Sequence, residues 1–506
     1  MRATTSIWLS SAPPSLGRPL AEGLDVDVAV LGGGISGITT ALLCARDGAT
    51  VAVLERETVA GTGGATGFTT AKASALQQTK LAQIRNLHGD EKTAAYAAAQ
   101  LDALDLIEGL VERHAIDCGW QRLPDVTFAL DRTQVDAVHA AQEAARAGGL
   151  AVHTTTPSPL PFEPPAAVQL DRQAIFDPVR YVRRLASLLV EEGGHVFDHT
   201  AVAQVHDGDP CRVVTAGGET VRAGAVVVCT NYPLLDRGAF FARMSAERSY
   251  VVAARVLDDP PAAMAISAGE PTRSIRPLLT DDRQRWVLIG GEGHPTGSSK
   301  ATPERYKALE RFARERFDVE EIPFRWSTQD GMPVDKLPYA GRYLPRSSRL
   351  FVNAGHQKWG MTNATAGARV VADLIAGRDS RFASLLDPNR VTLGAVPDAA
   401  KAQASAAAHL VGDRLTPAEA SSAAEVPTGE ARVVRSGRFG KVGVHRDDLG
   451  AVHAVSLRCT HLGCILHWND AERSWDCPCH GSRFGIDGQL LTGPASKPLE
   501  TVEAPQ

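Results

Sequence analysis

The sequence lacks an excess of charge of either sign. Of its 506 residues, 53 are Lys or Arg and 58 are Asp or Glu, which leaves a formal net charge of −5. A chain so close to neutrality gives no support for nucleic-acid binding or for a polybasic membrane anchor. The residues that follow Met1 also lack a sustained apolar core and a twin arginine, so we expect no export signal and a cytoplasmic location.

Long apolar runs are nearly absent as well. The uncharged stretch from Val28 to Ala45 has nearly the length of a membrane span. It contains glycine at 32, 33, 34 and 37, and this spacing favours a strand, a turn and a helix. We therefore expect no membrane span. With 44% hydrophobic and 22% charged residues, the composition is that of a globular protein of about two to four domains.

Cysteine is sparse in most of the chain, and the sequence shows no internal repeat. Four cysteines are scattered and are expected to be small buried hydrophobic residues: Cys44, Cys118, Cys211 and Cys229. The other four fall in a short C-terminal stretch: Cys459, Cys464, Cys477 and Cys479. In a cytoplasmic protein such a cluster indicates a metal site before a disulfide framework.

The chain divides into three segments. Residues 25–378 alternate strand-like and helix-like patterns, which predicts an α/β fold. Residues 379–426 are rich in Ala and Ser and poor in aromatic residues, so we expect a linker with room for one helix. Residues 427–506 carry short β-branched runs separated by Gly and Asp turns, which predicts a small all-β domain.

Within the first segment the patterns predict individual elements. Strands are expected at 25–31, 49–54, 225–231 and 349–355, and helices at 35–47, 90–115, 303–317 and 362–375. Thr362 or Asn363 is the expected N-cap of the last helix.

A dinucleotide-binding pattern lies between the first strand and the first helix. Gly32, Gly34 and Gly37 match G-x-G-x-x-G, and Glu55 stands at the end of the second strand. The glycines permit a tight turn and a close approach of the backbone to a pyrophosphate, at the positive end of a helix. We expect Ser36 and Arg56 beside this site and Glu55 on a ribose, the alternative being an ordinary glycine-rich turn.

FAD and NAD both fit this pattern, but its N-terminal position in a long chain favours FAD. A second glycine-rich loop, 61–67, follows soon after the acid. Two later strands end in turns at Thr230 and Gly355, and we expect these strand ends to lie at the cofactor. The last helix opens at Gly360, Met361 and Thr362, and its N-terminus could face a flavin that gains negative charge on reduction.

Together with Asp330-Gly-Met-Pro333 and Pro338-Tyr-Ala-Gly-Arg342, these motifs resemble the D-amino-acid-oxidase-like FAD oxidoreductases, the group of glycine and sarcosine oxidase. The resemblance implies a Rossmann-type FAD domain with an interleaved α+β substrate domain. It also implies oxidation of a C–N bond in an amine or amino-acid-like substrate, with hydride transfer to the flavin.

Four residues are candidates for catalysis. His356 and Lys358 lie in the loop before the last helix, Lys72 follows the second glycine loop, and Arg342 could hold a carboxylate or serve the family pattern structurally. A further glycine-rich stretch, 288–297, has Pro295 where a helix should begin, so we interpret it as a strand and turn. Without a second nucleotide loop we expect no built-in NAD(P)H site.

The strongest signal is at the C-terminal end. The patterns C-x-H-x-G-C and C-P-C-H-G-S resemble the two loops of a Rieske [2Fe–2S] domain, which needs two thiolates and two imidazoles. The resemblance implies the ligands Cys459, His461, Cys477 and His480. It also implies a disulfide between Cys464 and Cys479. A zinc site is the alternative, but a C-x-H pair is closer than zinc ligands usually stand.

The same resemblance bears on redox potential. In high-potential respiratory Rieske proteins the serine of C-P-C-H-G-S and a tyrosine two residues later donate hydrogen bonds to sulfur. Here Ser482 is kept and the second position is Phe484, so we expect a lower potential.

The two resemblances predict a flavoenzyme that relays single electrons through the cluster to or from a redox partner. The alternatives are a flavin reductase fed by NAD(P)H or a partner, and a non-enzymatic redox sensor. A Rieske oxygenase needs a mononuclear iron site after the Rieske domain, and only a short tail follows His480.

Overall fold

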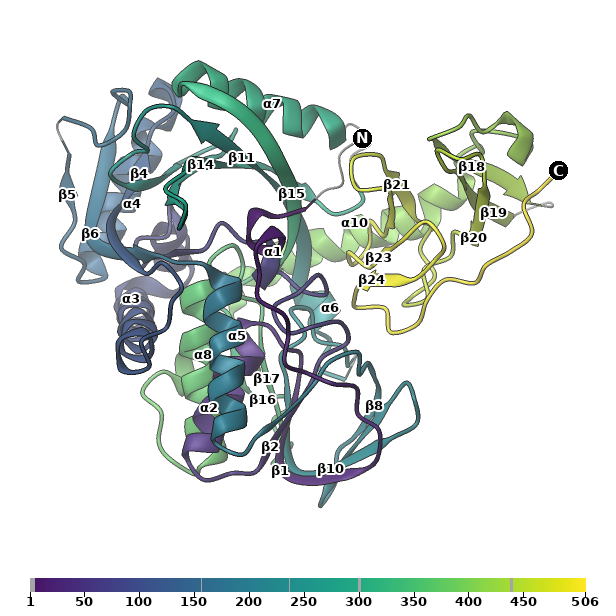
Figure 1. Cartoon of the computed structure of the whole chain (residues 1–506), viewed down its shortest axis with the longest axis horizontal. Coiled ribbons are helices and arrows are strands. Elements are labelled where there is room, and N and C mark those ends of the chain that lie inside the picture. Colours follow the sequence, from purple (N-terminus) through teal and green to yellow (C-terminus); the bar gives the residue numbers. More distant parts are fainter. Residues whose placement is uncertain (1–4, 156, 236, 299–301, 437–439) are drawn as a thin grey trace. The chain divides into compact units, whose positions relative to one another are not determined.

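The computed structural model of the chain describes residues 5–506 apart from 156, 236, 299–301 and 437–439 (Figure 1). The chain forms two compact units. The first contains residues 1–231, 249–292 and 306–394, and the second contains 232–248, 293–305 and 395–506. Two short segments from within the predicted oxidoreductase therefore belong to the same unit as the C-terminal region.

The first unit is built on a largely parallel sheet with the strand order β16-β17-β10-β1-β2-β7. Its strands are β1 (Leu24–Leu31), β2 (Val51–Leu54), β7 (His195–Phe197), β10 (Thr220–Val228), β16 (Tyr339–Arg342) and β17 (Leu350–Ala354). The hairpin of β8 (Val202–His206) and β9 (Cys211–Thr215) extends from β10. The central strands are almost wholly buried, which explains their continuous Val, Ala and Leu content.

Helices α5 (Pro178–Glu191) and α8 (Gly360–Ile375) both pack on α2 (Ile35–Arg46), and all three helices contact strands of this sheet. The other helices of the unit are α1 (Ile7–Ser10), α3 (Lys80–Arg113), α4 (Val135–Ala147), α7 (Thr302–Arg316) and α9 (Ala383–Leu386), α7 beginning in a second-unit segment. Short 3-10 turns lie at Thr66–Phe68, Arg132–Gln134 and Leu393–Ala395. No helix in the described part of the chain is both long and apolar enough to cross a membrane.

The second sheet of the first unit is mixed, with the order β15-β11-β14-β13-β12-β4-β6-β3 and with β5 paired to β6. Its strands are β3 (Lys72–Ala73), β4 (Gln121–Phe128), β5 (His153–Thr154), β6 (Ala167–Ile175), β11 (Met244–Val256), β12 (Met264–Ser267), β13 (Arg273–Leu279), β14 (Arg285–Pro295) and β15 (Val319–Pro333). Strands of the two sheets alternate along the sequence, which confirms the predicted interleaving of a Rossmann-type sheet with a substrate sheet.

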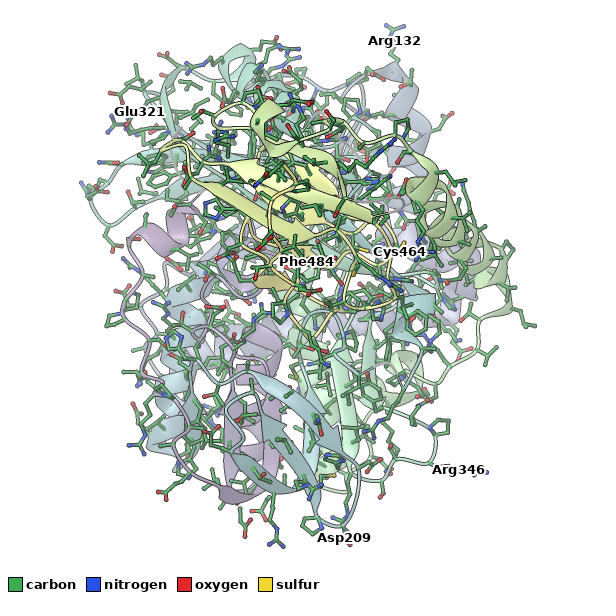
Figure 2. The ribbon with its side chains drawn as sticks, turned by 90° about the vertical axis from the view of Figure 1, so that its right-hand side faces the viewer. Arg132, Asp209, Glu321, Arg346, Cys464 and Phe484 are labelled. Atoms are coloured by element: carbon green, nitrogen blue, oxygen red, sulfur yellow. A yellow bond between two sulfur atoms is a disulfide. The ribbon has the colours of Figure 1, made fainter. Side chains whose placement is uncertain are left out.

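The second unit contains two small antiparallel sheets. One is formed by β18 (Ala431–Ser436), β19 (Gly440–Arg446) and β20 (Val452–Ser456), and the other by β21 (His467–Asn469), β22 (Ser474–Asp476), β23 (Arg483–Phe484) and β24 (Leu490–Thr492). Helices α6 (Phe240–Arg243) and α10 (Val396–Leu415) and a 3-10 turn at Ala423–Glu425 complete it. Val455, Leu457, Trp475 and Phe484 are fully buried at its core. Figure 2 shows Cys464 and Phe484 in this C-terminal region.

The predicted elements agree with the structure within a few residues, with two differences in helices. The helix predicted at 90–115 is the second part of α3, which begins at Lys80 and kinks at Gly89, where φ is 78°. The predicted N-cap of α8 is wrong, because the helix begins at Gly360 with Trp359 as its N-cap. The side chains of Thr362 and Asn363 are used elsewhere. Thr362 accepts a hydrogen bond from Gln77. Asn363 accepts one from Tyr96 and donates one to the His356 carbonyl. The glycine-rich stretch at 288–297 lies in β14, as predicted.

Candidate functional site

Four of the predicted cofactor-binding positions follow the carboxyl ends of neighbouring parallel strands. Leu31 at the end of β1 pairs in register with Leu54 of β2 and with Val228 of β10, and Val228 pairs with Val352 of β17. Gly32, Glu55 and Gly355 come directly after their strands, and Thr230 is the second residue after β10. Open α/β sheets bind ligands at this edge, so the fold gathers positions that are far apart in sequence.

The first glycine loop fits a close backbone approach. A Cβ added to Gly37 would lie 1.9 Å from the Gly32 carbonyl oxygen, and one added to Gly32 would lie 2.8 Å from the Cys229 carbonyl oxygen. Gly34 is the N-cap of α2 and supplies no side-chain cap to the helix. The N-terminus of α2 therefore presents amide groups and positive potential where a pyrophosphate would bind.

Glu55 borders the same loop. Its carboxylate accepts hydrogen bonds from the backbone N–H of Gly33 at 2.6 Å and of Glu57 at 2.9 Å. Burial raises the pKa of Glu55, and these two hydrogen bonds oppose that shift. Arg56 donates to the carbonyl of Gly63, in the second glycine loop. An acid held in this position suits the hydroxyl groups of a ribose.

The start of α8 closes the other side of this region. The Ser36 hydroxyl donates to the carbonyl of Asn353 at the end of β17, which ties α2 to this strand. Met361 and Thr362 are buried in the first turn of α8, and Thr362 accepts a hydrogen bond from Gln77. With Gly360 at its first position, the N-terminus of α8 fits the role predicted for it.

Lys72 is a buried cation on β3. Its ammonium group donates to the Ala265 carbonyl at 3.0 Å and lies 5.4 Å from the centre of the Trp359 ring. Burial lowers the pKa of Lys72 to about 8. Because Trp359 is the N-cap of α8, Lys72 lies beside the predicted flavin-facing helix end.

The other three predicted catalytic residues differ in their surroundings. His356 is buried, which lowers its pKa to about 4, so its ring is neutral at neutral pH. Lys358 is exposed. Arg342 is exposed on β16 and donates to the carbonyls of Ser347 and Ser348, which gives it a local structural role. Lys72 lies against the Trp359 ring, and the Trp359 amide donates to the His356 carbonyl, whereas Arg342 has no such contact with this helix end among the described residues.

Two charged residues that the sequence patterns did not single out are buried in the substrate sheet. Asp125 on β4 is fully buried, burial raises its pKa, and the charge of Lys72 opposes that shift. Arg276 on β13 is 1% exposed, donates to the Phe176 carbonyl at 2.9 Å, and its guanidinium lies 4.6 Å from the centre of the Trp8 ring. The sequence did contain a signal for both residues, namely a charged side chain within a strand-like pattern. Buried charges are rare without a function or a partner.

In the second unit the two Cys/His loops have the same backbone form. The amide of Cys459 donates to the Cys464 carbonyl, and the amide of Cys477 donates to the Ser482 carbonyl. Gly463 and Gly481 donate back to the two first cysteines, with φ of 78° and 79°. The glycine in each motif is therefore needed for a left-handed turn that closes the loop.

The loops bring two thiols and two imidazoles together. A hydrogen bond from the Cys477 thiol lowers the pKa of Cys459, and the same contact raises the pKa of Cys477. The rings of His461 and His480 lie 5.1 Å apart between centres. Two sulfur and two nitrogen donors gathered in this way match the donor set of a Rieske cluster.

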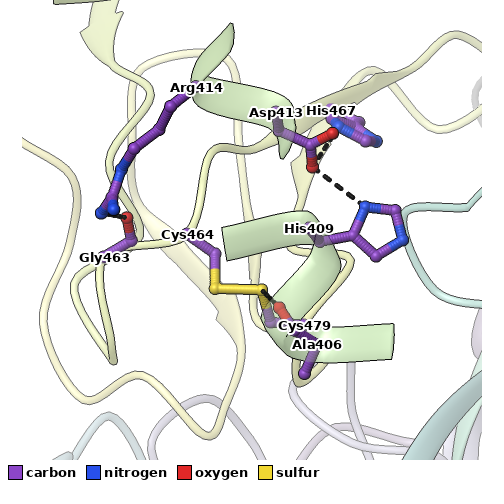
Figure 3. Close-up of a disulfide and its surroundings, with 8 residues drawn as sticks. All are labelled: Ala406, His409, Asp413, Arg414, Gly463, Cys464, His467 and Cys479. Carbon is purple, nitrogen blue, oxygen red and sulfur yellow. Dashed lines mark hydrogen bonds and ion pairs between the residues drawn. A yellow bond between two sulfur atoms is a disulfide. The ribbon is translucent and has the colours of Figure 1, made fainter. Parts of the chain in front are cut away.

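The implied disulfide between Cys464 and Cys479 is confirmed. It joins the two loops, as Figure 3 shows. A hydrogen bond between Ser482 and Cys459 contributes to the lowered pKa of that thiol. Phe484 is fully buried and has no hydroxyl group that could donate a second hydrogen bond to a sulfur.

Phe241 covers the histidine pair and was not predicted. Its ring meets the ring of His461 at 5.7 Å and that of His480 at 5.4 Å, edge to face in both cases. Phe241 lies in α6, within the segment 232–248 that follows β10 in the chain. His480 is buried, at 7% exposure.

Comparison with known proteins agrees with both halves of this description. Residues 27–374 match the family DAO, FAD dependent oxidoreductase, and residues 417–503 match the Rieske [2Fe-2S] domain. The chain belongs to the DAO family of FAD-dependent oxidoreductases. It also carries a C-terminal Rieske domain, so its cofactors are FAD and a Rieske [2Fe–2S] cluster.

This DAO-family chain is also similar to individual proteins in sequence and in fold. It is 31% identical over 504 residues to the Rieske 2Fe-2S iron-sulfur protein YhfW of Bacillus subtilis strain 168, covering 99% of this chain and 98% of YhfW. The cytochrome b6-f complex iron-sulfur subunit of Chlorobaculum thiosulfatiphilum is 38% identical over 92 residues, 18% of this chain and 48% of that one. Glycine oxidase from Geobacillus kaustophilus has a similar fold, with a TM-score of 0.60, 20% identity, and coverage of 73% of this chain and 99% of that one.

Proposed function

We propose that this oxidoreductase oxidises the C–N bond of an amine or amino-acid-like substrate and passes the electrons one at a time through its Rieske cluster. Bound FAD accepts the hydride, and the cluster carries single electrons to a redox partner. The observation that carries the proposal is the buried Lys72 beside Trp359 at the N-terminus of α8. The fold shared with glycine oxidase supports the choice of substrate class.

The buried charges suit a substrate with both an amino and a carboxylate group. Arg276 offers a guanidinium held by Phe176 and Trp8, and Asp125 offers a carboxylate within reach of the charge of Lys72. In a low-dielectric interior each charge is stabilised strongly by an opposite one. We assign Arg276 to the substrate carboxylate and Asp125 to its amino end.

Lys72 is the residue assigned to proton transfer. An amine must lose its ammonium proton before its C–H bond can give up a hydride, and the proton needs an acceptor. Burial brings the pKa of Lys72 to about 8, near the range in which a base works at physiological pH. His356, neutral because of its burial, can accept a hydrogen bond but is a weaker base.

The geometry of the second unit supports an assignment of the cluster ligands. We assign Cys459 and Cys477 to one iron and His461 and His480 to the other. Because Phe241 packs on both imidazoles, the histidine edge is covered by a segment of the chain itself.

Anaerobic screening tests the proposal. The holoenzyme is mixed with amines and amino acids, flavin absorbance is followed, and the reduced cluster is measured by electron paramagnetic resonance. We expect a subset of amino compounds to bleach the flavin and then produce the cluster signal, while NADH does neither. Bleaching by NADH with no response to any amino compound would establish the reductase alternative in its place.

A further inference from the structure

A second group of metal-binding side chains lies outside the cluster loops. His409 and Asp413 are one turn apart on α10, and His467 lies at the start of β21. The three ligand atoms lie within 4.8 Å of one another. Figure 3 shows the two imidazoles directed to the carboxylate, near the disulfide.

The distances suit a common ion. One carboxylate oxygen of Asp413 lies 3.0 Å from Nδ1 of His409 and 3.1 Å from Nε2 of His467. Two ligand atoms each about 2.1 Å from a tetrahedral zinc ion lie about 3.4 Å apart. These two separations would therefore have to widen by about 0.3–0.4 Å to admit the ion.

The hydrogen bonding of His467 provides an independent argument. Its Nδ1 lies 2.7 Å from the carbonyl oxygen of Gly297, which only accepts, so Nδ1 carries a hydrogen. Its Nε2 faces the Asp413 carboxylate, which is a second acceptor. A neutral imidazole has one N–H and cannot serve both acceptors, so the ring either carries both hydrogens or binds a metal ion at Nε2. The ion would satisfy the ring and the carboxylate together. A backbone carbonyl on the other nitrogen is also the usual support of a metal-bound histidine.

The hydrogen bonds of the nearby cations go to groups other than the carboxylate, although the charge of Lys441 acts on Asp413. The ammonium group of Lys441 donates to the backbone carbonyl of Asp413 and to the Thr416 hydroxyl. Arg414 donates to the Gly463 carbonyl at 3.1 Å. The side chains of His409, Asp413 and His467 are 31%, 15% and 26% exposed, so an ion can reach them from solvent.

We propose that His409, Asp413 and His467 bind a divalent first-row transition metal ion, for which Zn²⁺ is the probe. Two imidazoles and one carboxylate are a ligand set that zinc accepts, with one position left for water. The ion would join α10 to β21. This site goes beyond the proposed function, because neither FAD nor the cluster uses these residues.

Zinc binding to the holoprotein tests the site. After mild chelation that leaves the visible spectrum of the cluster unchanged, Zn²⁺ is titrated by calorimetry into the full chain. We expect one zinc per chain, weakened by at least about 100-fold in Asp413→Asn, which keeps the side-chain shape. Zinc should also raise the unfolding temperature of the wild type and not that of this variant.

The matched control is His453→Ala. His453 pairs with Asp447 at 3.4 Å and at similar exposure, but the described residues supply no third ligand there. Its loss should leave zinc binding unchanged. Wild-type chain that takes up no zinc, or Asp413→Asn that binds it as well as the wild type, would overturn the site. Sulfur ligands in the zinc X-ray absorption spectrum would do the same, since they would place the ion in the cluster loops.

Discussion

The proposed cofactor contacts of the first unit are spread from Gly32 to Thr362, whereas all four proposed ligands of the second lie between Cys459 and His480. The first unit offers mainly backbone amides at strand ends and helix N-termini, around one carboxylate. The second offers thiol and imidazole side chains on two loops of identical backbone form. A site built from side-chain ligands can be recognised in a sequence by the types and spacing of those residues. A site built from backbone amides can be recognised only by the glycines that give the ligand room.

The largest expected effect is the loss of one cofactor without the other. Cys459→Ala or His480→Ala should abolish the [2Fe–2S] cluster because each removes a ligand, and FAD should stay bound. Iron and sulfide analysis with the flavin spectrum measures both. Cys211→Ala, at a buried thiol of the first unit, is the control and should keep the cluster. Zinc in place of iron in the wild type would contradict the cluster assignment. Loss of FAD together with the cluster would contradict the independence of the two units.

The reverse experiment is Gly37→Ala. The added methyl group would collide with the Gly32 carbonyl, 1.9 Å away, so the loop must open and FAD binding should fall by at least about 100-fold. Gly109→Ala is the control, since its Cβ would meet nothing within 4 Å and alanine favours a helix. FAD content and the cluster signal are measured together. Full FAD occupancy in Gly37→Ala would show that the glycine loop is not the pyrophosphate site.

A third experiment addresses Lys72, the residue proposed for proton transfer. Below its pKa of about 8 the amine is protonated and cannot accept a proton; above it the neutral base predominates. The rate of flavin reduction should therefore rise through about pH 8 in the wild type. Lys72→Met should lower it by roughly 10²- to 10⁴-fold and remove this step. Lys358→Met, at an exposed lysine in the loop before α8, is the control. An unchanged pH profile in Lys72→Met would remove Lys72 from proton transfer.

The smallest effect concerns the cluster potential. Hydrogen bonds to sulfur stabilise the reduced state, so Ser482→Ala should lower the potential and Phe484→Tyr should raise it. A hydrogen bond worth ~1 kcal/mol corresponds to about 40 mV for a one-electron couple. Redox titration of the full chain, followed by paramagnetic resonance, provides the measurement. A wild-type potential at the top of the Rieske span of about −150 to +300 mV, unmoved by both changes, would contradict this account.

The sequence was sufficient for the main elements because their patterns are local. The strand before Gly32, the helix after it and the strand before Glu55 lie within a residue or two of their predicted positions. The N-cap of α8 was missed because Thr362 and Asn363 bond to partners far away in the chain. The domain limits at 378 and 427 and the assignments of individual site residues stay predictions.

Asp125, Arg276 and Phe241 illustrate what local patterns leave out. Asp125 and Arg276 stand in separate strands, and their burial beside Lys72 and Trp8 depends on the order of strands in the sheet. Phe241 lies far from the cluster loops in sequence, and its contact with both histidines depends on how the second unit folds.

The sequence by itself determined the family and both cofactors, because the spacing of a motif within one loop or one βαβ unit is set by local backbone geometry. The pairing of Cys464 with Cys479 was implied by the resemblance to Rieske domains, and the structure confirms it. Only the tertiary structure brought Lys72 to Trp359, Phe241 to the histidines, and His409 and Asp413 to His467. Those contacts join residues distant in the chain. They arise from burial and packing of whole elements, which no short pattern encodes.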